Sequence, residues 1–96
     1  MSGTSNPQRY KYKVVTSSTP TPISVNGQTG DFLHSVVLNA NGVSTFVIRD
    51  NLTNIFVLNT TSAGLYVYEF NIASQNGGWF ISCSNGTIIG IGTFTN

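Results

Sequence analysis

Residues 32–48 of the chain, FLHSVVLNANGVSTFVI, contain the pattern that decides the fold class. Two runs rich in β-branched and aromatic residues stand on either side of Asn41-Gly42, and such runs favour β-strands. Asn-Gly suits the positive φ angles of tight hairpin turns, so this stretch predicts strand, turn and strand. The same dipeptide recurs at Asn26-Gly27, Asn76-Gly77 and Asn85-Gly86. We therefore expect a series of short strands separated by turns.

Six segments along the chain have this composition. They are residues 32–38, 43–48, 55–58, 65–72, 79–83 and 87–94. Apolar residues do not recur at helical spacing, and good helix formers are scarce, with one Met and one Glu in the chain. The fold class that follows is all-β. At this length we expect a compact antiparallel β-sandwich or jelly roll with an extended N-terminal arm.

Length and composition narrow the possible classes of protein. A chain of 96 residues allows one domain. Charged residues make up 7% and the net charge is +1, whereas an ordinary soluble domain is about 25% charged. Such a composition excludes disorder driven by charge, and the scarcity of helix formers excludes a coiled coil. No apolar run approaches the roughly 20 residues of a membrane span, so we expect no membrane partner.

The first part of the chain differs from the rest. Residues 1–8 are small and polar, and residues 16–22, TSSTPTP, have the composition of an extended linker. We therefore divide the chain into an extended basic arm with its Ser/Thr/Pro linker, residues 1–22, and a β-sandwich domain, residues 23–96.

An alternating motif lies inside this arm. The two-residue period of a strand places Arg9, Lys11 and Lys13 on one side and Tyr10 and Tyr12 on the other. Two interpretations are open: an edge strand whose lysines block aggregation, or a segment that binds a partner through all five residues. Three cations without a flanking basic patch are a weak electrostatic footprint, so we expect no nucleic-acid partner.

Few residues could support catalysis. The candidates are His34, Cys83, Asp31, Asp50 and Glu69. Asp31 and His34 are three residues apart, which places them on opposite faces of one strand, and His34 shares its face with apolar neighbours at 32, 36 and 38. Cys83 alternates in phase with two apolar residues, which indicates a buried and inert thiol. We expect no enzyme, no catalytic residue, no metal site and no cofactor.

Several strands are apolar on both faces. Leu65 and Val67 oppose the apolar face that begins at Tyr66, and Leu33 and Val37 oppose the face of residues 32, 36 and 38. One small domain cannot cover two faces of a sheet, and interfaces are depleted of charge. We expect Leu33, Val37, Leu65 and Val67 to form an oligomer interface, and we favour a homotrimer.

Residues 30–58, GDFLHSVVLNANGVSTFVIRDNLTNIFVL, resemble small bacteriophage virion proteins. Leu33-His34-Ser35 matches their opening strand, Asp50-Asn51 the turn after the second strand, and residues 78–81, GWFI, the strand before the last hairpin. The resemblance implies a capsid decoration, or cement, subunit that binds and stabilises a phage head shell. Its partner would be the major capsid protein or another virion protein. With no secretory signal at its start, the chain is expected to be made in the host cytoplasm and to end up in the virion.

A second function remains open from the sequence. A β-sandwich of a phage tail or fibre could bind carbohydrate or a receptor by stacking sugars on Trp79, Tyr66 or Tyr68. These aromatic residues fit a hydrophobic core equally well. Exposure of Trp79 separates the two functions.

Overall fold

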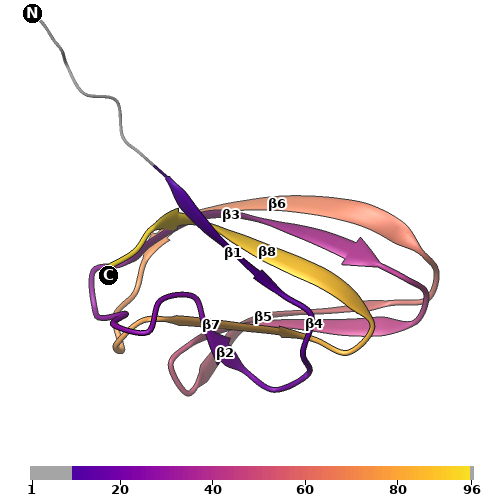
Figure 1. The fold of residues 1–96 in the computed structure, drawn as a ribbon, viewed down its shortest axis with the longest axis horizontal. Helices are drawn as coiled ribbons and strands as arrows, with labels where there is room; N and C mark the ends of the chain where they lie inside the picture. The colour runs from indigo at the N-terminus through magenta and orange to yellow at the C-terminus, as the bar shows by residue number, and fades with distance from the viewer. Residues whose placement is uncertain (1–9, 96) are drawn as a thin grey trace, which may run out of the picture.

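A computed structural model describes residues 10–95, which form two four-stranded antiparallel sheets packed face to face (Figure 1). The strands are β1 (Lys11–Val15), β2 (Thr21–Pro22), β3 (Phe32–Ala40), β4 (Ser44–Asp50), β5 (Thr53–Thr60), β6 (Gly64–Ala73), β7 (Trp79–Cys83) and β8 (Gly86–Thr93). Their order is β1-β8-β3-β6 in the first sheet and β2-β7-β4-β5 in the second. Eight strands in this order form a jelly roll, so the expected all-β sandwich is confirmed. Residues 10–95 include no helix that could span a membrane.

Most connections in this fold cross from one sheet to the other. Among the described residues, only β4 and β5 are both consecutive and paired, and they turn at Asn51-Leu52, where Asn51 has a φ of 57°. Asn41-Gly42 joins β3 to β4 in the opposite sheet, and Asn85-Gly86 likewise joins β7 to β8. The expectation that Asn-Gly marks hairpins is therefore corrected. A positive φ allows a sharp reversal, but it does not determine which strand lies alongside.

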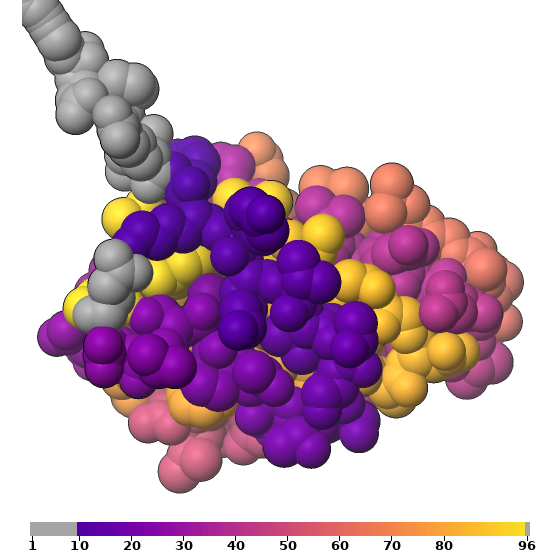
Figure 2. Space-filling model, in the orientation of Figure 1, coloured from indigo at the N-terminus to yellow at the C-terminus, as the bar shows by residue number. Residues whose placement is uncertain are grey.

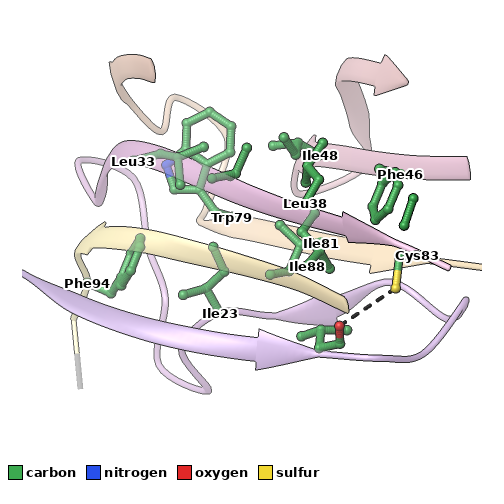
Figure 3. Packing of buried hydrophobic residues seen from close by; sticks show 13 residues of the cluster. Ile23, Leu33, Leu38, Phe46, Ile48, Trp79, Ile81, Cys83, Ile88 and Phe94 are labelled. Atoms are coloured by element: carbon green, nitrogen blue, oxygen red, sulfur yellow. Dashed lines mark hydrogen bonds between the residues drawn. The ribbon is translucent and has the colours of Figure 1, made fainter. Parts of the chain in front are cut away.

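The core lies between the two sheets (Figure 3). Strands of both sheets turn alternate side chains inward, as β4 does with Ser44, Phe46, Ile48 and Asp50. The buried hydrophobic residues are Val15, Ile23, Leu33, Val36, Leu38, Ala40, Phe46, Ile48, Trp79, Ile81, Cys83, Ile88 and Phe94. Burial of this cluster is the main source of stability, since each fully buried aliphatic or aromatic side chain contributes about 1.5 to 3 kcal/mol.

A β-bulge in β3 changes which residues face the core. The register with β6 and with β8 shifts between Leu33 and Ser35, so the two-residue alternation is interrupted at His34. As a result Leu33 faces inward together with Val36 and Leu38, and all three have no exposed surface. Leu33 is therefore a core residue, and its assignment to an oligomer interface is wrong. His34 is partly exposed and lies away from Val36 and Leu38, so the face predicted for it is also wrong.

The segment that precedes residue 23 is part of the sandwich. β1 pairs with β8 from Lys11 to Val15, and β2 pairs with β7. Ile23 is buried just after β2, and the Cys83 amide donates to the Ser17 carbonyl over 2.9 Å. In Figure 2 this indigo segment lies across the visible side of the molecule. The expected separate arm and linker are therefore corrected for residues 11–22, while Arg9 and residues 1–8 lie outside the described residues.

This placement predicts that residues 10–22 are required for stability. A chain that starts at residue 23 lacks two strands and the buried Val15 side chain, so we expect it to lose its cooperative thermal transition. Val15→Asp buries a carboxylate, and we expect the melting temperature to fall by about 10 °C or more. Val14→Asp, at an exposed position of the same strand, is the matched control and should change it by only a few degrees. Equal melting temperatures for the two variants, measured by circular dichroism, would contradict the role of β1.

Candidate interaction surface

The outer face of the first sheet carries an aliphatic row that crosses all four strands. Val14 of β1 pairs with Ile89 of β8, Ile89 pairs with Val37 of β3, and Val37 pairs with Val67 of β6. Val67 is 61% exposed and Val14 is 47% exposed, and the two central residues are partly exposed. Cross-strand neighbours on one face have Cβ atoms about 5 Å apart, so these four side chains form a continuous apolar strip.

The strip continues onto neighbouring positions. Tyr12 pairs with Ile91 of β8, next to Val14, and is 72% exposed. Leu65, two residues before Val67 on the same face of β6, is 68% exposed. We call these side chains the outer face; it consists of Tyr12, Val14, Val37, Leu65, Val67, Ile89 and Ile91. Val37, Leu65 and Val67, predicted for an interface from the sequence, thus share one surface with Tyr12, which was predicted to bind a partner.

Two of the charged residues predicted for partner binding, Lys11 and Lys13, lie off this surface. Lys11 and Lys13 alternate with Tyr12, so their side chains leave β1 on the other side, and both are exposed. β1 is the edge strand of its sheet, in agreement with the interpretation of an edge protected by lysines. Tyr10 lies outside β1, with its ring centroid 4.7 Å from that of His34. Whether any of these residues contacts a partner stays a prediction.

Two residues of the outer face, Ile89 and Ile91, were not singled out from the sequence. They alternate with Gly90 and Gly92, which face inward on β8. A Cβ atom at position 90 would lie 2.7 Å from the Ile23 side chain, so only glycine fits there without a shift of Ile23. The signal was present in TIIGIG, where the two-residue period separates isoleucine from glycine.

Asp50 and Asp31, two of the candidate catalytic residues, are buried in structural hydrogen bonds at one end of the sandwich. The Asp50 carboxylate accepts hydrogen bonds from the Ser74 hydroxyl at 2.5 Å and from the backbone N–H groups of Gln75 at 2.8 Å and Asn76 at 3.3 Å. It thereby ties the end of β4 to the loop between β6 and β7. Buried carboxylates need such donors, because an unpaired buried charge is costly.

Asp31 fastens a second set of loops at the same end. Its carboxylate accepts hydrogen bonds from the Thr95 hydroxyl at 2.6 Å and from the backbone N–H of Gln28 at 3.2 Å. Its backbone carbonyl accepts hydrogen bonds from the Trp79 indole at 2.9 Å and from the backbone N–H of Ser74 at 2.7 Å. Ser74 therefore links both aspartates. A shallow hollow of about 620 Å³, lined by residues 28–32 and 93–95, lies beside Asp31.

The aromatic residues of the alternative function all face the interior of the sandwich, although Tyr66 and Tyr68 are only partly buried. Trp79 is 3% exposed and packs in the core, where Figure 3 draws it beside Leu33. Tyr66 and Tyr68 face inward from β6 and are half-buried, and the Tyr68 ring centroid lies 5.0 Å from that of Phe56. Stacking of a sugar on Trp79 would therefore require this end of the core to open.

Of the remaining three candidates, His34 and Cys83 do not meet, and Glu69 is exposed on β6. His34 is paired with the neighbouring Ser35 hydroxyl, with 2.9 Å between its Nδ1 and the Oγ. Cys83 is buried, as predicted, and its thiol donates to the carbonyls of Gly86 at 3.2 Å and Val15 at 3.7 Å; Figure 3 marks the bond to Val15. In the part of the chain that the structure describes, no group of three His, Cys, Asp or Glu side chains could hold a metal ion.

No protein-family model matches the chain, and a comparison with curated proteins finds no significant match.

The hydrogen bonds of Asp50 predict that its loss lowers the unfolding free energy much more than the loss of Glu69 does. Asp50→Ala leaves three donors without their acceptor, and hydrogen bonds to a charged group contribute about 1.5 to 3 kcal/mol, so we expect the unfolding free energy to fall by about 2 to 4 kcal/mol. Glu69→Ala is the control, because Glu69 is exposed on β6, and it should change this free energy by about 0.5 kcal/mol or less. Urea denaturation measures both. Similar values for the two variants would contradict the structural role of Asp50.

Burial also predicts the reactivity of Cys83. Desolvation raises the pKa of the Cys83 thiol, so the folded chain holds its proton at a pH where an unfolded chain, with a thiol pKa of about 8.5, releases it. The unfolding free energy should therefore fall as the pH rises above about 8.5, and Cys83→Ala should remove that part of the slope.

We also expect Cys83 to react with maleimide at least about tenfold more slowly in the folded protein than in urea. Equal labelling rates would show that the thiol is accessible.

Proposed function

We propose that the chain is a structural virion protein, a capsid decoration subunit that binds a phage head shell and stabilises it. The observation that carries this proposal is the outer face, an apolar strip that crosses four strands and ends in exposed Val14 and Val67. Contiguous exposed apolar surface marks interaction sites. The jelly roll is used by viral capsid domains, but also by lectins and cupins, so the fold alone supports the proposal only by analogy.

Docking would proceed by burial of the outer face against the major capsid protein or another virion protein. Apolar burial contributes about 25 cal/mol per Å², while exposed charge pairs contribute about 0.2 to 1 kcal/mol each. Tyr12 and Val14 are therefore stronger anchors than Lys11 and Lys13 on the same strand. In a homo-oligomer, for which three copies were predicted, several outer faces would bind one shell together, and avidity would exceed the affinity of each.

Cosedimentation with purified phage heads tests this proposal. The double variant Val14→Lys with Val37→Lys places two cations in the strip and should weaken binding at least about tenfold, which corresponds to about 1.4 kcal/mol. Val25→Lys with Val43→Lys is the matched control, because both valines are exposed in loops away from the outer face. We expect the control to bind like the unchanged chain.

Two results would contradict the proposal. Heads that do not retain the unchanged chain would remove the docking function, and equal binding of both double variants would remove the outer face as its site. Binding to a glycan array without binding to heads would support the alternative, a carbohydrate- or receptor-binding module of a phage tail or fibre.

A further inference from the structure

We propose that copies of this chain associate through the open side of the sandwich, the side formed by β5 and β6. This association is separate from capsid docking, because it concerns the edge strands β5 and β6, which share only Leu65 and Val67 with the outer face, and it requires no other protein. At the edges of the two sheets, backbone groups have no strand partner among residues 10–95.

The two sides of the sandwich end in different edges. β1 and β2 are the edge strands on one side, and β6 and β5 are the edge strands on the other. β7, the neighbour of β2, contacts both β1 and β8, which shows that β1 and β2 lie on the same side. β1 carries two exposed lysines, and β2 has only two residues and ends in Pro22. Lysine, proline and short length all hinder pairing with another strand. The β1–β2 side is therefore protected.

The open side has much less protection of this kind. β6 has ten residues and β5 has eight, and together they contain no proline and a single charged residue, Glu69. The positive φ of Asn71, 54°, accompanies the register shift near the end of β6 and leaves Gly64–Phe70 as its regular part. Long, nearly uncharged edges of this kind are the ones that pair with other chains.

Apolar side chains fill the space between these two edges and flank it. Phe56 of β5 contacts two aromatic residues of β6, with ring centroids 5.0 Å from Tyr68 and 5.4 Å from Phe70. Phe56 and both partners are only partly buried, so the core reaches the surface here. On the outer sides of the strands, the exposed fraction is 43% for Ile55, 47% for Val57, 68% for Leu65 and 61% for Val67.

The size of the open side fits a specific interface. A strand of eight to ten residues is about 27 to 34 Å long, and two sheets about 10 Å apart, with their outer side chains, are about 20 Å thick. The side therefore covers about 600 Å², close to the roughly 800 Å² that each partner contributes to a standard interface.

A second copy of the chain is the occupant that fits best. With Glu69 as its one charge, the open side offers little to a strongly charged partner, whereas an apolar surface is complementary to itself. Unpaired edge groups also need another unprotected edge, and in a second copy the long unprotected strands are again β5 and β6. A two-fold or a three-fold axis beside these strands would bring the open sides together.

Hydrogen exchange of the full chain at low and high concentration tests this inference directly. At about 200 µM we expect amides of residues 53–73 to exchange about tenfold or more slowly than at about 1 µM, because association covers their strands. Amides of residues 11–15 should not change with concentration, since the β1 edge stays free. Slowing confined to other residues would assign association elsewhere, and no slowing anywhere would overturn the inference.

A pair of variants tests it by a second route. Ile55→Lys with Val57→Lys, both on β5 and outside the outer face, adds to the open side the residue type that protects β1. This pair should convert the associated protein to a monomer in sedimentation velocity. Val25→Lys with Val43→Lys is the matched control and should sediment like the unchanged chain. Melting temperatures above the working temperature exclude unfolding as the cause. An oligomer that survives the first pair would overturn the inference, whether or not the chain binds phage heads.

Discussion

A two-layer β-sandwich has one interior, and each strand can turn only one of its two faces toward it. This constraint decides the role of almost every residue in the chain. The inward faces supply the core, from Phe46 and Ile48 in one sheet to Leu38 and Ile88 in the other. The outward faces have no second layer within the described residues. Packing in the core therefore does not explain why valine, isoleucine and tyrosine occupy the outer face of the first sheet.

The two buried aspartates hold one end of this sandwich in place. Asp50 and Asp31 accept hydrogen bonds from residues that lie between 3 and 64 positions away in the sequence, and Ser74 contacts both aspartates. The loops after β2, β4 and β6 and the end of the chain are thereby joined. This network gives the two aspartates a structural role, and the outer face and the open side lie on other strands of the sandwich.

Local patterns were enough to predict much of this structure. The two-residue period correctly placed Tyr66 and Tyr68 on the inner face of β6 and buried Cys83 on β7. It failed at Leu33, because the bulge at His34 reverses the alternation, and no local feature of FLHSV indicates a bulge. Composition also misled at residues 11–22, where the partners of β1 and β2 lie more than 50 residues away. The hydrogen bonds of Asp31 and Asp50 also join segments that are distant in the sequence, so they could not be predicted from local patterns.

Assembly connects the outer face, the open side and the proposed place in a virion. A small domain with so few charges and so much exposed aliphatic surface is expected to cover part of that surface, the open side, with copies of itself. Sedimentation equilibrium of the full chain over a range of concentrations measures this most directly. We expect a mass that rises with concentration to a small whole multiple of 10.3 kDa. A mass of 10.3 kDa at every concentration, up to about 200 µM, would contradict it.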